Sequence, residues 1–143
     1  MRAIIVALTV LVLLPGVTTA QADPVKEIEG SYDLKQIYED GKFTPVDVLR
    51  NYQEATIANG ELTLRSTAGT DVAKFTIDAT QKIPQIDFAS TKPGETKTAP
   101  GIYKMDKGEL TIVFHRGGTR PTDFKGDGKG MVKLILVKRV PKK

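Results

Sequence analysis

The sequence predicts an all-β protein, folded as an antiparallel up-and-down, lipocalin-like β-barrel of about eight strands with one short helix. Two observations predict it. Apolar residues recur with a period of two along most of the chain, and turn-forming residues separate these segments at short intervals. A sandwich fits the same pattern, but a barrel is favoured because it leaves no open strand edge to aggregate.

The first hairpin is indicated by an Asn-Gly pair at positions 59–60. This pair accepts the positive φ angles of a tight hairpin turn. With these two residues as the loop, Ile57 lies opposite Leu62 and Ala55 lies opposite Leu64. One face of the hairpin is then apolar and the other polar, as a half-buried antiparallel pair requires.

The second hairpin turns near a Lys-Gly pair, and the loop there fits either two or three residues. A two-residue loop at 107–108 sets Met105 against Leu110. A three-residue loop at 106–108 would instead set Lys104 against Leu110 and bury an amine among aliphatic side chains, which is costly. We therefore expect the two-residue loop.

The remaining elements follow from the same patterns. Further strands are expected at residues 30–38, 42–44, 72–77, 85–89, 119–124 and 131–139. A helix is expected at 45–51, because proline suits a first helical turn and Val46 and Leu49 form an apolar side. The last strand carries aliphatic residues on both faces, so this helix is the candidate to cover its outer face.

The alternation also predicts which side chains face the interior. The inward set is Tyr32, Leu34, Ile57, Leu62, Leu64, Phe75, Ile77, Ile86, Phe88, Tyr103, Met105, Leu110, Ile112, Phe114, Leu134 and Leu136. A small barrel is either filled by such side chains or holds one small ligand. Several aromatics and no enrichment in small residues favour filling. If a pocket exists, Tyr103, Phe114 and Arg120 are the candidate ligand-binding residues at its more polar end.

The first segment of the chain has the pattern of a secretory signal peptide. An apolar run at 3–14 is followed by Pro-Gly at 15–16 and by small residues at 20 and 22. This run is too short to cross a membrane as a helix. We expect cleavage before Asp23, export to the periplasm or the cell exterior, and one domain at 23–143 with no membrane span after cleavage.

Composition excludes several functional classes. The chain has no cysteine, so it carries no disulfide, no cysteine-ligated metal, no thiol nucleophile and no lipid-anchored cysteine. The formal net charge is +4, but no basic cluster is present, so nucleic acid is not an expected partner. The charge is expected to form a solvated surface.

No catalytic or metal site emerges from the remaining residues. His115 is the only histidine, whereas a zinc site takes three or four ligands. A histidine base also needs a nucleophile and an orienting group, and neither is identified. The glycine-rich stretch at 125–130 lacks the spacing of a phosphate loop or a calcium loop. We therefore expect no enzyme, no cofactor and no metal.

Four short motifs resemble one family. They are Gly-Ser-Tyr at 30–32, Glu-Asp-Gly-Lys at 39–42, Gly-Ile-Tyr at 101–103 and Arg-Pro-Thr-Asp-Phe at 120–124. Together with the aliphatic last strand, they resemble the uncharacterised lipocalin-like domain family expanded in planctomycete bacteria. The resemblance implies a calycin-type barrel, and it implies no known activity.

The resemblance also implies how the barrel floor is built. The family carries a tryptophan where this chain has Tyr32, and a buried tyrosine hydroxyl needs a hydrogen-bond partner. A late arginine commonly packs across that aromatic ring in lipocalins. Arg139 and Arg120 are both candidates for this role.

Two functional hypotheses therefore stand. One is an exported barrel that binds a small apolar or amphipathic molecule. The other is a solid-core structural or protein-interaction module that acts through its outer surface. The volume of the interior distinguishes them, since a cavity of several hundred Å³ supports binding. The sequence does not indicate the identity of the ligand, a protein partner or the oligomeric state.

Overall fold

The computed structural model describes residues 23–90, 93–94 and 97–142 of the chain. The predicted leader, residues 1–22, lies outside the described residues. These residues include two short helices, α1 (Pro24–Ile28) and α2 (Val46–Leu49). Within the described ranges, no helix is both long and apolar enough to cross a membrane.

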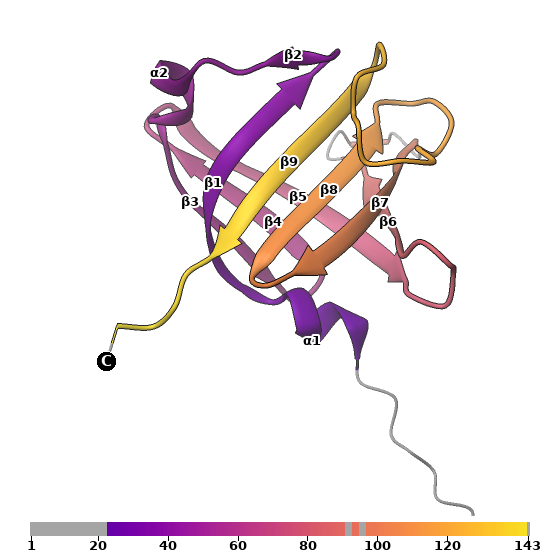
Figure 1. Cartoon of the computed structure of the whole chain (residues 1–143), viewed down its shortest axis with the longest axis horizontal. Coiled ribbons are helices and arrows are strands. Elements are labelled where there is room, and N and C mark those ends of the chain that lie inside the picture. The colour runs from indigo at the N-terminus through magenta and orange to yellow at the C-terminus, as the bar shows by residue number, and fades with distance from the viewer. Residues whose placement is uncertain (1–22, 91–92, 95–96, 143) are drawn as a thin grey trace, which may run out of the picture.

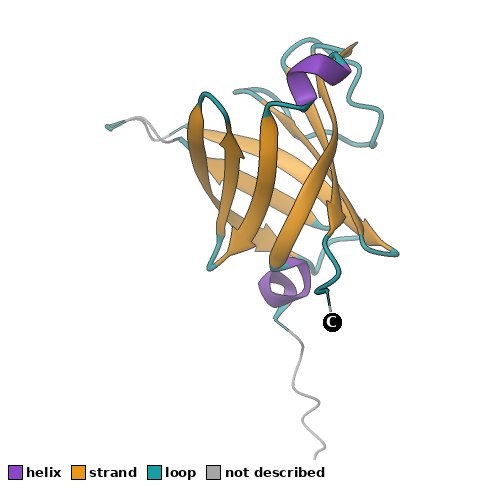
Figure 2. Ribbon diagram, turned by 90° about the vertical axis from the view of Figure 1, so that its left-hand side faces the viewer, coloured by secondary structure: helices purple, strands orange, loops and turns teal. Residues whose placement is uncertain are grey.

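The rest of the fold consists of antiparallel strands. They are β1 (Gly30–Glu39), β2 (Lys42–Phe43), β3 (Tyr52–Ala58), β4 (Glu61–Ser66), β5 (Gly69–Asp78), β6 (Gln85–Ala89), β7 (Thr98–Asp106), β8 (Glu109–His115) and β9 (Met131–Lys138). Each strand from β3 to β8 pairs with the next along the chain, and β1 pairs with both β3 and β9. This closes the sheet into a barrel, with β2 added at the end of β1 (Figures 1 and 2). The predicted all-β barrel is confirmed.

Both predicted hairpins are confirmed in register. Ile57 pairs with Leu62 and Ala55 with Leu64 across the first turn. Across the second turn Met105 pairs with Leu110, as the two-residue loop requires. Both loops have the backbone conformation of a tight two-residue hairpin turn. Asn59 and Lys107 adopt positive φ angles of 52° and 48°, and the glycine that follows each of them also has a positive φ angle.

The strand predicted at 119–124 is wrong. This segment belongs to the irregular loop between β8 and β9. Pro121 is buried there, and its missing N–H suits it poorly to a strand ladder. The Arg120 guanidinium donates to the Gly101 carbonyl oxygen at 2.8 Å, which ties the loop to the outside of the barrel.

The expectation that a helix covers the last strand is also wrong. α2 contacts β1 instead, and Leu49 is buried in the core. The helix lies where β1 leaves β3, because those strands pair only between Gly30 and Tyr32 on β1. The loop between β8 and β9 supplies the outer cover, and its Phe124 lines one groove with Ile135 of β9.

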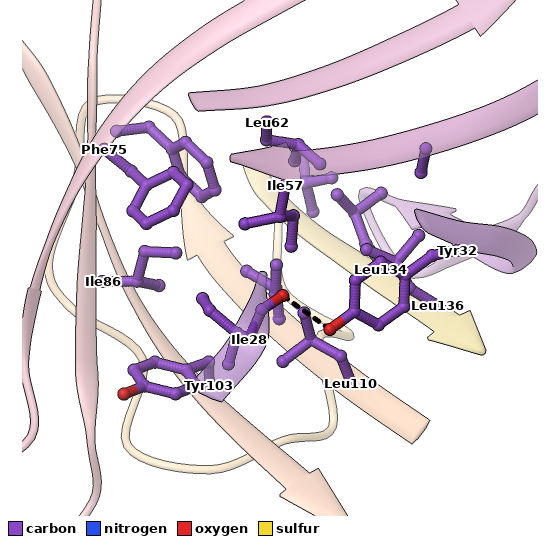
Figure 3. Close-up of a cluster of buried hydrophobic side chains, with 14 of the residues drawn as sticks. Ile28, Tyr32, Ile57, Leu62, Phe75, Ile86, Tyr103, Leu110, Leu134 and Leu136 are labelled. Atoms are coloured by element: carbon purple, nitrogen blue, oxygen red, sulfur yellow. Dashed lines mark hydrogen bonds between the residues drawn. The ribbon is translucent and has the colours of Figure 1, made fainter. Parts of the chain in front are cut away.

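One end of the barrel is closed by α1, which the sequence did not predict (Figure 1). Asp23 caps this helix by accepting a hydrogen bond from the Val25 amide at 3.0 Å. Ile28, the last residue of α1, is buried among the core side chains (Figure 3). The Tyr32 hydroxyl donates to the Ile28 carbonyl oxygen at 2.6 Å, so the partner expected for this tyrosine is present.

The predicted inward set is confirmed in full. Each of its residues is buried in the core cluster or packs against it. The structure adds Ile28, Ile37, Leu49, Ala55 and Val132 to the buried members. On the outer face, Ile102 and Val113 are also buried, because the loop between β8 and β9 packs on that side of the barrel.

We expect Tyr32→Phe to lower the free energy of unfolding by about 1–3 kcal/mol, because it leaves the buried Ile28 carbonyl oxygen without its donor. Urea denaturation followed by circular dichroism measures this change. Tyr38→Phe is the control, since the Tyr38 hydroxyl donates to the nearby, partly buried Gln36 side chain, at 3.2 Å, and to no backbone carbonyl of the described residues. Equal losses in the two variants would contradict the role given to Tyr32.

Burial raises the pKa of Tyr32 to about 12, from 10.0. Between these values the unfolded chain has lost the phenolic proton and the folded chain retains it. The free energy of unfolding therefore falls as pH rises from about 10 to about 12. Tyr32→Phe should make this fall shallower. The substitution should not abolish the fall in stability, because the pKa of Tyr103 is also raised, mainly by burial and secondly by the charge of Glu27. An unchanged pH profile in Tyr32→Phe would contradict this assignment.

Candidate functional site

A cavity of about 1110 Å³ occupies the half of the barrel opposite α1. Its lining comes from the ends of β1, β4, β6 and β8 and from the beginnings of β3, β5, β7 and β9, which meet at one rim. Aliphatic and aromatic side chains form its walls, among them Leu62, Leu64, Phe88, Phe114 and Leu134. The cavity is open to solvent at this rim.

The cavity exists because small side chains face inward at this level. Ala73 of β5 and Ala99 of β7 line the cavity directly. Phe75 and Phe88 meet edge to face, with ring centroids 6.0 Å apart, and the two cavity-lining rings of Phe88 and Phe114 lie 5.0 Å apart. The expectation that side chains fill the whole barrel is therefore wrong for the open half.

Charged residues lie around the rim of the cavity. Glu39 at the end of β1 and Arg116 just after β8 form an ion pair of 2.7 Å. Asp71 of β5 and Lys97 before β7 line the opposite side of the rim. The site thus combines apolar walls with charges of both signs at its entrance, an arrangement suited to an amphipathic molecule.

The side of the rim next to β9 is held by hydrogen bonds of the backbone and of the Asp40 carboxylate. Asp40 accepts a hydrogen bond from the Gly130 amide at 2.5 Å and donates its own amide to the Met131 carbonyl at 3.0 Å. The Arg116 amide donates to the Gly130 carbonyl oxygen at 2.9 Å. These bonds fix the turn after β1 to the base of the loop between β8 and β9.

The body of that loop is held against the outer wall. Arg120 forms an ion pair of 2.7 Å with Asp87 of β6, besides its bond to the Gly101 carbonyl. The Lys104 ammonium lies 4.8 Å from the centre of the Phe124 ring. The Arg-Pro-Thr-Asp-Phe motif at 120–124 therefore acts as an anchor for the loop in this fold.

The three predicted ligand-binding residues are not brought together. Phe114 lines the cavity. Tyr103 does not line the cavity and lies toward α1. The pKa of Tyr103 is raised mainly by burial and secondly by the negative charge of Glu27. Arg120 lies on the outer wall with Asp87, so its expected place at the polar end of the pocket is wrong.

His115 has a packing role at the base of the loop. Its ring lies against the backbones of Gly118 and Gly130, and a Cβ atom at Gly118 would overlap the ring. Its buried Nδ1 has no hydrogen-bond partner among the described residues. Nowhere in the described part of the chain do three His, Asp or Glu residues gather as a metal site would need.

Comparisons with known proteins identify no relative, since no family model, no curated protein and no solved structure matches this chain. The resemblance to the planctomycete family therefore stays a prediction. Its implied stacking of an arginine on Tyr32 is not observed for either candidate. Arg139 is on the outside, where it forms an ion pair of 2.6 Å with Asp33, and Arg120 pairs with Asp87.

The charged residues of the rim were not predicted from the sequence. Glu39 and Asp71 share the inward-facing parity of Ile37 and Ala73, two residues away on the same strands. Extending the alternation of Phe75 and Ile77 to the start of β5 would have placed Asp71 inside. On β1 the irregularity between Leu34 and Gln36 reverses the parity, so alternation from Tyr32 and Leu34 would have placed Glu39 outside. Arg116 follows a strand and belongs to a loop, so no periodicity identifies it.

We expect Gly118→Ala to lower the free energy of unfolding by about 1–3 kcal/mol, because the added methyl group overlaps the His115 ring. Gly128→Ala in the same loop is the control. Its Cβ would meet only the flexible Met131 side chain, at 3.2 Å, so we expect little change. Urea denaturation of both variants measures the difference, and equal stabilities would contradict the packing described for His115.

Proposed function

We propose that this protein binds a small amphipathic molecule, with the apolar part of the ligand inside the barrel and its polar part at the rim. The observation that carries the proposal is the cavity of about 1110 Å³ in the open half. Ligand pockets usually range from about 300 to 1,000 Å³ and combine apolar walls with a few polar groups. This cavity is slightly larger than the upper end of that range, and its apolar walls and charged rim match the description in chemistry.

The difference between the two ends of the barrel supports binding over a solid-core role. At the α1 end, Ile28, Tyr32 and Leu110 pack with almost no exposure. At the other end, the inward residues Ala73 and Ala99 line a cavity that is open at the rim. A barrel built only as a rigid scaffold would gain stability from filling both ends, because close packing lowers the free energy of the folded state.

Export is part of the same proposal. The pattern at 1–22 supports a signal peptide that is cleaved before Asp23. Cleavage at this bond keeps Asp23, the residue that caps α1, on the mature chain. Intact-mass measurement of the protein recovered from the exported fraction tests the proposal. A mature chain that begins within or after α1, or one retained in the cytoplasm, would contradict it.

Cavity filling tests the binding site. We expect Ala73→Phe to weaken binding of the fluorescent probe N-phenyl-1-naphthylamine by about tenfold, because the ring takes up space that the probe needs. Val72→Phe is the matched control, since Val72 is the neighbouring residue on β5, faces outward and is 42% exposed. Fluorescence titration gives the dissociation constants.

Two results would contradict binding in the cavity. One is a wild-type protein that does not enhance the fluorescence of the probe. The other is an equal loss of binding in the Ala73 and Val72 variants, which would favour a site on the outer surface. Thermal unfolding of both variants confirms that each is folded at the temperature of the titration.

A further inference from the structure

The two sides of the cavity rim differ in how their charges are satisfied. On the side next to β9, Glu39 and Arg116 form their 2.7 Å ion pair, and each side chain is 51% exposed. The hydrogen bond from the Gly130 amide to the Asp40 carboxylate holds this side in place. A ligand would have to displace one partner of the pair to use the other.

The opposite side carries two charges without such partners. Asp71 and Lys97 both line the cavity, and neither forms an ion pair within the described part of the chain. Asp71 pairs in register with Leu64 and lies two residues before Ala73, so its side chain belongs to the inner face of β5.

Lys97 is placed at the rim by the connection between β6 and β7. Its carbonyl oxygen accepts a hydrogen bond from the Ser90 amide at 3.1 Å, which continues the pairing of β6 with β7 by one step. Lys97 lies two residues before Ala99, a cavity-lining residue of β7. One carboxylate and one ammonium group therefore flank β6 at the entrance.

We propose that the polar end of the ligand is a zwitterion, with its ammonium group against Asp71 and its acidic oxyanion against Lys97. This inference rests on the proposed function and adds the class of head group. Because β6 lies between β5 and β7, those two strands are roughly 10 Å apart. Asp71 and Lys97 are thus set to hold opposite charges of one head group rather than to neutralise each other.

A singly charged head group matches the entrance less well. An anionic head group is attracted by the Lys97 ammonium but repelled by the Asp71 carboxylate. A cationic head group is attracted by Asp71 but repelled by Lys97. Exposed charge pairs contribute about 0.2–1 kcal/mol each, so we expect a preference for the zwitterion of up to about fivefold. The effect should weaken at high salt because both groups are solvent-exposed.

Amphiphiles with the same decyl chain and different head groups test this inference. The set is decylphosphocholine, decyltrimethylammonium, decyl sulfate and decanol, each used below its micelle-forming concentration to displace N-phenyl-1-naphthylamine. We expect decylphosphocholine to bind most tightly to the wild-type protein. Asp71→Asn should move the preference toward decyl sulfate, and Lys97→Gln should move it toward decyltrimethylammonium.

The controls carry the same changes of charge away from the rim. Lys74→Gln removes a cation from the outer face of β5, where Lys74 lies 3.9 Å from Glu61. Asp106→Asn removes an anion from the other end of β7, on the outer groove. Neither should alter the order of head groups, and an equal effect of control and rim variants would overturn the assignment to Asp71 and Lys97.

The outcomes separate this inference from the proposed function. If all four amphiphiles displace the probe equally well, or a singly charged one binds best to the wild type, the zwitterion assignment is wrong and binding in the cavity stands. If none of them displaces the probe, and Ala73→Phe leaves probe binding unchanged, the proposed function itself is wrong.

Discussion

The pairing of β1 with β9 is the interaction on which the rest of the structure depends, because it turns a sheet into a closed wall. It runs from Tyr32 opposite Lys138 to Glu39 opposite Val132, with one irregularity between Leu34 and Gln36. Closure assigns every strand an inner and an outer face. The interior volume, the floor and the rim all follow from that assignment.

Different side chains along one wall give the barrel two unlike halves. Near α1, large side chains meet around Tyr32, whose hydroxyl is satisfied by the Ile28 carbonyl oxygen. Near the rim, Ala73 and Ala99 occupy inward positions and leave space. Side chains therefore fill the end near α1, and the other end holds the open cavity.

The fold could be predicted where it depends on neighbouring residues. The Asn-Gly and Lys-Gly turns fix the two hairpins through positive φ angles, and alternation then assigns the inward faces. The loop between β8 and β9 could not be predicted in the same way. Its path depends on Arg120 meeting Asp87 and Gly101, which are distant in sequence and come together only in the closed barrel.

The candidate site was only partly predictable for the same reason. Phe114 was identified from its parity, but whether a cavity exists depends on which side chains meet across several strands. Ala73 and Ala99 belong to strands separated by β6, and the two pairings set Ala99 level with Phe88 and Phe75, so the outline of the cavity requires both registers. Arg120 was misplaced because its chemistry suits a polar pocket, while its position lies on the outer wall.

The most direct test of the account is methyl NMR of the wild-type protein during titration with decylphosphocholine. We expect the largest shift changes at the methyl groups of Leu62, Leu64 and Leu134, which line the cavity. The methyl groups of Leu110 and Leu136, fully buried near the α1 end, should change little. Changes confined to the exposed Val72 and Val137, or no changes at all, would contradict a ligand site inside the barrel.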